Sequence, residues 1–265
     1  MRPAIALFDA LAADYDEHFG VPHRRAYDDL AWERTQAVLP PPPATVLDVG
    51  CGVGRWAERL TSAGYDVIGI EPAPAMADEA ARRLDGARFR LLRASVEEAD
   101  LPSDAADVVL AMGSIQYADD VRAAIRRLAA WARPGGAVCL VVDSLVALGI
   151  ELIRDGKDVE AVERVTTRRG LWTQRDRSAS MELFDLATLR ASVLAAGLTI
   201  EQCAGLLVGA SVFGRVELSR RLTADYDRAL RRERALAQQP ELADLGKQLF
   251  VAARKPDCPV PDPPP

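Results

Sequence analysis

The stretch Thr45-Val46-Leu47-Asp48-Val49 runs directly into Gly50-Cys51-Gly52-Val53-Gly54-Arg55. Its first five residues are apolar or β-branched apart from Asp48, which is typical of a buried strand. Glycine then occupies every second position, so the backbone can turn sharply and approach a ligand closely. Residues 55–63 carry apolar side chains at helical spacing. The stretch therefore predicts a strand, a ligand-binding loop and a helix.

The alternation of strand and helix continues beyond this loop. Short apolar runs alternate with helical patterns, which is the signature of βαβ units. We therefore expect an α/β, Rossmann-like fold with a seven-stranded, mostly parallel sheet and helices on both faces. The expected strands cover residues 45–49, 66–70, 88–92, 107–112, 137–142, 198–208 and 248–254, and the expected helices cover residues 55–63, 74–84, 119–132, 185–196 and 215–237.

Prolines mark the ends of the predicted main domain, residues 44–255. The run Pro40–Pro43 follows two amphipathic helical patterns, at residues 4–19 and 24–39, and we interpret residues 1–43 as an N-terminal helical cap. Within the main domain, a charge-rich insert at about 144–185 lacks a clear period and is expected to form a lid. The proline-rich tail 256–265 is expected to be disordered.

Composition excludes several classes of protein. The 265 residues are 49% hydrophobic and include 33 Lys+Arg against 39 Asp+Glu, a net charge of −6. Such a balance argues against a nucleic-acid partner, whose backbone needs a basic face. No apolar run is long enough for a membrane span, and Asp9 interrupts the N-terminus too early for a secretory signal, so a cytoplasmic protein is expected. No metal site is expected, because the cysteines are far apart in sequence: Cys51, Cys139, Cys203 and Cys258.

Two carboxylates define the chemistry of the glycine loop. Glu71 ends the second strand, 23 residues after Asp48, where an open α/β sheet places an acid that accepts hydrogen bonds from ribose hydroxyls. A nicotinamide dinucleotide prefers G-x-G-x-x-G, but Arg55 occupies the position of the last glycine. Asp48 would also repel a pyrophosphate, whereas it suits a ligand with an ammonium and a sulfonium. The loop therefore favours S-adenosylmethionine over NAD.

Further motifs accompany the glycine loop in order along the chain. The full set is Ala12–Asp16, Val46–Gly54, Glu71-Pro72, Ala94-Ser95-Val96, Asp107–Met112 and Arg133-Pro134-Gly135-Gly136. With this set, the sequence resembles the small-molecule type of class I S-adenosylmethionine-dependent methyltransferases. The resemblance covers roughly residues 10–145 and a final strand, Leu249–Arg254.

The resemblance implies roles for individual residues in binding S-adenosylmethionine. Asp48 and the Met112 carbonyl would hold the methionine ammonium, beside the backbones of Gly50 and Gly52. Glu71 would bind the ribose. Pro72, Met76, Ser95 and Val96 would contact the adenine, and Gln116 or Tyr117 would border the transferred methyl group. Tyr15 is a further candidate for binding the cofactor, because it could fold over it, with a place in the hydrophobic core as the alternative.

Candidate catalytic residues are His18, His23 and Tyr117. These two histidines are the only ones in the chain, and histidine is the commonest general base near neutral pH. Trp172, in the charged insert, is a candidate substrate contact.

Three methyltransferase subclasses are disfavoured. Residues 112–117 lack the Pro-Pro-aromatic stretch of nucleobase-amine enzymes, Met112 replaces the metal-binding acid of the catechol type, and no three-cysteine cluster motif is present. We therefore expect metal-independent, in-line methyl transfer to a small or medium organic acceptor by a monomer or homodimer. Two alternatives stay open: a cofactor-binding protein that does not methylate, such as a cyclase or regulatory module, and, less favoured, an NAD-dependent oxidoreductase.

Overall fold

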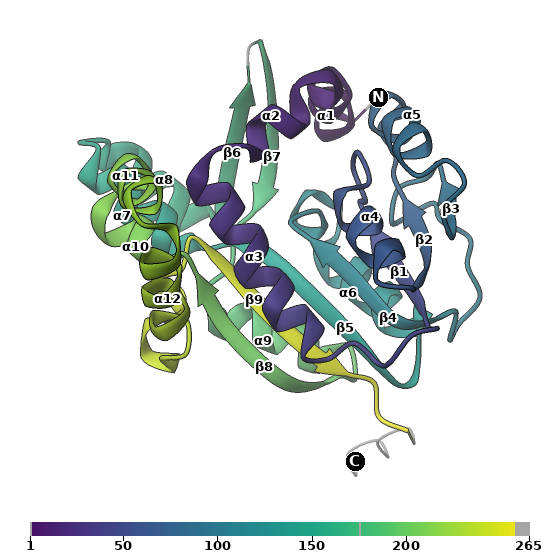
Figure 1. The fold of residues 1–265 in the computed structure, drawn as a ribbon. Coiled ribbons are helices and arrows are strands. Elements are labelled where there is room, and N and C mark those ends of the chain that lie inside the picture. The colour runs from purple at the N-terminus through teal and green to yellow at the C-terminus, as the bar shows by residue number, and fades with distance from the viewer. Residues whose placement is uncertain (1, 175, 258–265) are drawn as a thin grey trace.

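One central sheet organises the protein. The structure is a computed structural model that describes residues 2–174 and 176–257. Within that part of the chain, seven strands form a sheet in the order β3-β2-β1-β4-β5-β9-β8, with helices on both faces (Figure 1). Only β9 runs antiparallel to its neighbours in this sheet, which confirms the predicted fold class. The strands are β1 (Thr45–Val49), β2 (Asp66–Ile70), β3 (Phe89–Leu92), β4 (Ala106–Met112), β5 (Ala132–Asp143), β8 (Thr199–Leu206) and β9 (Gln248–Arg254).

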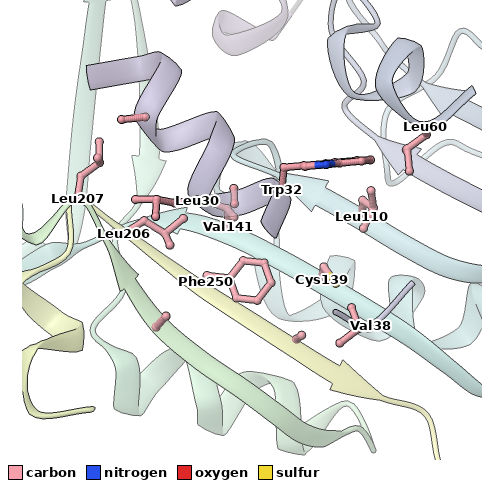
Figure 2. Close-up of a cluster of buried hydrophobic side chains, with 14 of the residues drawn as sticks. Leu30, Trp32, Val38, Leu60, Leu110, Cys139, Val141, Leu206, Leu207 and Phe250 are labelled. Atoms are coloured by element: carbon pink, nitrogen blue, oxygen red, sulfur yellow. The ribbon is translucent and has the colours of Figure 1, made fainter. Parts of the chain in front are cut away.

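Two hydrophobic cores lie on opposite faces of this sheet, because successive side chains of a strand point to opposite sides. Val46 of β1 belongs to the core under α3 and α4, whereas Leu47 belongs to the core under α6 and α9. Figure 2 shows part of the first core, with Trp32 of α3 extending toward Leu60 of α4. The covering helices are α3 (Pro22–Gln36), α4 (Arg55–Ser62), α6 (Val121–Trp131) and α9 (Leu186–Ala195).

The N-terminal segment has more breaks than predicted. The helix expected over 4–19 is divided into α1 (Pro3–Leu11), the 3-10 turn η1 (Ala12–Asp14) and α2 (Tyr15–Phe19). After Gly20, Pro22 starts α3 with a fixed φ, so the chain bends there and α3 crosses the sheet. Because α3 contributes Leu30 and Trp32 to the main core, it is part of the sheet packing. The division into a cap, a main domain and a tail stays a prediction.

The charged insert is regular in structure despite its irregular sequence. It forms α7 (Leu145–Arg154), α8 (Asp158–Thr167) and an antiparallel hairpin of β6 (Arg169–Gln174) and β7 (Arg177–Glu182). Ala179 and Met181 of β7 are buried, while Ser180 between them is exposed. Both strands have only six residues, and few of these are apolar, so the alternation is too short to predict a strand. In Figure 1 the hairpin stands beside α1 and α2.

The single helix predicted over 215–237 is wrong. Asp225 has an extended backbone and its side chain accepts a hydrogen bond from the Arg228 amide, so it ends one helix and caps the next. The predicted tail 256–265, with Cys258, lies outside the described residues from 258 onward. The remaining elements are α5 (Pro74–Arg83), η2 (Ile115–Tyr117), α10 (Val208–Phe213), α11 (Arg215–Ala224), α12 (Tyr226–Leu236) and η3 (Pro240–Leu245).

Candidate active site

The glycine loop after β1 folds back onto the end of β2. The backbone amides of Gly50 and Cys51 both donate to the carbonyl of Ile70. Gly50 has a φ of +73°, and a Cβ at this position would lie 2.3 Å from the Cβ of Ser114. Gly54, at +84°, faces Ala80 and Leu84 of α5. Its glycine therefore allows the close approach of this loop to α5.

Two buried carboxylates lie at this loop. Glu71 accepts hydrogen bonds from the amides of Gly52 (2.9 Å) and Ala73 (2.8 Å). Asp48 is 2% exposed, and its Oδ2 is buried with no hydrogen-bond partner among the described residues. Burial raises the pKa of both acids to about 7, with the charge of Glu71 adding to the effect on Asp48. A ligand with a positive charge would stabilise both as carboxylates.

A cavity over this loop brings together most of the residues predicted to bind the cofactor. Asp48 is not part of its surface and lies buried on β1, two residues before Gly50. The Oγ of Ser95 is also buried without a hydrogen-bond partner in the described residues. Of the predicted residues, Tyr15, Gly50, Gly52, Glu71, Pro72, Met76, Ser95, Val96 and Met112 line the cavity.

Helix α1 forms a wall of this cavity that the sequence analysis did not assign. Ile5 and Phe8 line it from this helix. Asp9 accepts a hydrogen bond from the Ala75 amide at the start of α5, and Arg2 forms ion pairs with Glu97 and Asp119. The apolar stripe of α1 was visible in the sequence, but no local signal showed which surface it would cover.

A second chamber of about 600 Å³ lies beside the first. Five residues line both cavities: Phe8, Tyr15, Met112, Gly113 and Tyr117. This shared boundary is where a group could pass from a ligand in one cavity to a ligand in the other. The chamber volume falls within the range of small-molecule sites.

All three predicted catalytic residues line the second chamber. His18 stacks on Trp172 of the hairpin, with ring centroids 5.8 Å apart, and His23 shares a hydrogen bond of 2.8 Å between its Nδ1 and the Oγ of Ser219. Burial and the nearby Arg24 lower the pKa of each histidine to about 4. Both are therefore neutral at pH 7, and the same shift makes each a weaker proton acceptor than an ordinary imidazole.

Gln116 lies in the second chamber and not in the first. Its amide nitrogen donates to Asp143 Oδ2 (2.9 Å), and its oxygen accepts from the Asp143 backbone amide (2.7 Å). The side chain thus holds the end of β5 in place. Its direct contact with the cofactor stays a prediction, as do the roles of the other predicted site residues.

Comparisons with known proteins agree with this geometry. A methyltransferase domain family matches residues 46–136. The ubiquinone biosynthesis O-methyltransferase of Rhodopseudomonas palustris (strain BisB18) is 38% identical over 95 residues, 34% of this chain and 36% of that protein. A solved S-adenosylmethionine dependent methyltransferase from Mesorhizobium loti covers 85% of this chain and 98% of its own, with a TM-score of 0.58 at 17% identity. The protein carries a class I S-adenosylmethionine-dependent methyltransferase domain.

This methyltransferase domain decides between the two cofactors that the glycine loop could hold. S-adenosylmethionine is the cofactor, and the residues present fit it. The unpartnered Asp48 Oδ2 and Ser95 Oγ are buried acceptors for its donor groups, and the loop at Gly50 is too tight for a side chain.

The names of the relatives do not identify the class of molecule on which the methyltransferase domain acts. A tRNA U34 carboxymethyltransferase from Shewanella sp. (strain W3-18-1) is 38% identical over 129 residues, 46% of this chain and 38% of that protein. The chain thus spans little more than a third of the length of either curated relative. The predicted exclusion of nucleic acid stays a prediction, as does the cytoplasmic location. In the described residues, no helix is both long and apolar enough to cross a membrane.

Arg55, which replaces a glycine of the dinucleotide pattern, joins the methyltransferase domain to the N-terminal helices. Its guanidinium pairs with the buried Asp28 of α3 and with Asp16 (3.7 Å), and it lies 4.2 Å over the ring of Phe19. We expect Arg55→Gln to lower the free energy of unfolding by about 1–3 kcal/mol, because Asp28 loses its partner. Hydrogen exchange should also speed up in residues 15–36, measured by mass spectrometry.

The control for this prediction removes both charges. Asp28→Asn combined with Arg55→Gln leaves no unpaired buried charge and is expected to recover most of the lost stability. A single Arg55→Gln variant with unchanged stability and unchanged hydrogen exchange would contradict the idea that Arg55 holds the N-terminal helices on the methyltransferase domain.

Proposed function

We propose that the protein transfers the methyl group of S-adenosylmethionine to a small or medium organic acceptor by metal-independent, in-line displacement. The observation that carries this proposal is the pair of adjoining cavities. One is lined by Glu71 and by the unpartnered acceptor Ser95, with the buried Asp48 behind the glycine loop, and the other is lined by the candidate catalytic residues. The name of the ubiquinone biosynthesis relative supports a small organic acceptor.

The cofactor cavity has a part for each portion of S-adenosylmethionine. Asp48 would hold the ammonium, Glu71 the ribose hydroxyls, and Pro72 and Met76 the adenine faces. When bound, the cofactor supplies an activated methyl group on a cationic sulfur. The chain needs only to place the acceptor in line with that methyl group and to exclude water, and proximity alone contributes roughly 7–11 kcal/mol.

Aromatic side chains cover the boundary where the two cavities meet. The ring of Phe8 packs edge-on against Tyr117 and Trp172, with both centroid distances at 5.2 Å. These contacts join α1, η2 and the hairpin beside the shared boundary. His18 or His23 would take a proton from an acceptor that is protonated at working pH.

Two measurements test the proposed function. Isothermal titration with S-adenosylhomocysteine and with NAD should show binding of the first only. A panel of phenols, amines and carboxylic acids, incubated with S-adenosylmethionine carrying a labelled methyl group, should yield a labelled product. Binding of NAD alone would overturn the proposal, and a product formed without label would favour the non-methylating alternative.

A further inference from the structure

Arg24 is a cationic side chain without an anionic partner, at the wall of the second chamber. It is the third residue of α3, and no carboxylate of the described residues lies within ion-pair distance of its guanidinium. The contact it makes is with the ring of Phe19, whose centroid is 5.4 Å away. Burial lowers its pKa, although a guanidinium stays charged at neutral pH. A cation in the first turn also opposes the helix dipole, so packing alone does not explain this position.

The acids of the chamber are already engaged by other groups. Glu151 pairs with Lys247 (2.7 Å) and Arg215 (2.5 Å). Asp143 accepts hydrogen bonds from the side-chain amides of Gln116 (2.9 Å) and Gln248 (3.2 Å). The charge of Asp143 still raises the pKa of Arg24, but neither carboxylate forms an ion pair with its guanidinium in the described residues.

The chamber is positive inside a negative protein. Its lining contains four basic side chains, Arg24, Lys157, Arg215 and Lys247, against the two acids Asp143 and Glu151. His18 and His23 add no charge at pH 7, because both titrate near pH 4. The whole chain carries a net charge of −6, so the excess of cations is local. Such a local field attracts and orients an anionic ligand.

Aromatic side chains form part of the chamber wall. Trp172 stacks on His18 with an interplanar angle of 28° and meets Phe8 edge-on. Tyr15 and Tyr117 line the boundary with the cofactor cavity. These surfaces suit a flat body next to the anionic group.

We propose that the methyl acceptor is an organic acid with an aromatic or unsaturated body, and that Arg24 determines specificity by binding its carboxylate. This inference rests on the proposed function, because it names the acceptor of that reaction. Arginine suits this role since its planar fork matches a carboxylate with two parallel hydrogen bonds.

Binding of acids and of their neutral amides tests the assignment without requiring turnover. The probes are 4-hydroxycinnamate, 3,4-dihydroxybenzoate and indole-3-acetate, each paired with its primary amide. Calorimetry on the full chain, with and without saturating S-adenosylhomocysteine, should show at least one acid binding tenfold or more tightly than its amide. Arg24→Gln should reduce that preference to within about twofold, and Arg24→Lys should keep part of it because the charge remains.

Arg25→Gln is the matched control, because it removes the same charge from the next residue of the same helix. Arg25 is exposed and lies over the ring of Tyr226, away from the chamber. The preference for acids should be unchanged in this variant. Equal binding of every acid and its amide in the unmodified protein, or a preference that survives Arg24→Gln, would overturn the assignment.

The same samples separate this inference from the proposed function. Methyl transfer to neutral acceptors, with no preference for acids, would overturn the role of Arg24 and leave the proposed function standing. Failure to bind S-adenosylhomocysteine would overturn the proposed function, while an acid preference that depends on Arg24 would still identify an anion site.

Discussion

Asp48→Asn is expected to stabilise the cofactor-free protein and at the same time to weaken its binding of S-adenosylmethionine. In the cofactor-free protein the carboxylate has lost its hydration, has no partner for Oδ2 in the described residues and faces the charge of Glu71. An amide of the same shape removes the charge. We expect the free energy of unfolding at pH 8 to rise by roughly 2–4 kcal/mol, since each unit of pKa shift corresponds to about 1.4 kcal/mol.

This stabilisation should depend on pH with a definite sign. The pKa of Asp48 is about 7 in the folded protein, against 3.8 for the ordinary carboxyl. Between these values the folded state keeps a proton that the unfolded state releases, so the stability of the unmodified protein falls as pH rises from about 4 to 7. The advantage of Asp48→Asn should therefore be absent near pH 4 and largest above pH 7, measured by urea unfolding across that range.

Cofactor binding by the same variant should move in the opposite direction. The affinity for S-adenosylmethionine is expected to fall roughly tenfold or more, because a charge-assisted hydrogen bond to the ammonium is lost. In the unmodified protein the affinity should also decrease below pH 7, as Asp48 and Glu71 take up protons.

Asp107→Asn is the matched control for Asp48→Asn. Asp107 is also a buried aspartate, on the neighbouring strand β4, but it pairs with Arg133 and accepts a hydrogen bond from the Thr45 amide (2.7 Å). Removing a partnered charge should lower stability. If both substitutions destabilise the protein at pH 8, the Asp48 carboxylate does not lower the stability of the cofactor-free protein, and the prediction is wrong.

The fold was predictable where one periodicity dominates a segment. The strand predicted over 66–70 coincides with β2, and the helix predicted over 74–84 ends one residue beyond α5. The hairpin of β6 and β7 had no such signal, because β6 buries only Gly170 and exposes Leu171, and β7 buries only Ala179 and Met181. Asp225 also looked like an ordinary charged residue of a helix, although it caps one.

The candidate site was predictable on the sheet and less so around it. Asp48, Gly50 and Glu71 come from strand ends, whose positions relative to one another are fixed by the parallel sheet. Arg24 and the wall made by α1 depend on how separate helices dock, and that docking is decided by the summed packing of distant surfaces. A charged residue in a sequence does not reveal whether it will find a partner.

Gly50→Ala is expected to disrupt the cofactor loop by two separable effects. The positive φ of +73° is strained for alanine by about 1–2 kcal/mol. The new methyl group would also lie 2.3 Å from Ser114 Cβ, and such overpacking adds roughly 1–3 kcal/mol. We expect a loss of about 2–4 kcal/mol in the free energy of unfolding and a large loss of affinity for S-adenosylhomocysteine, both measured on the same samples.

Gly86→Ala isolates the first of these two effects. Gly86 has the same φ of +73°, but no atom lies within 4 Å of its added Cβ. The difference between the two alanine variants therefore measures the contact with Ser114. Adding Ser114→Gly to Gly50→Ala removes the opposing Cβ and should restore part of the stability, with a coupling energy of about 1–3 kcal/mol. If Gly50→Ala loses no more stability and affinity than Gly86→Ala, the loop does not need the close approach of Gly50 to Ser114. In that case Gly50 has no special role in binding the methionine portion of the cofactor.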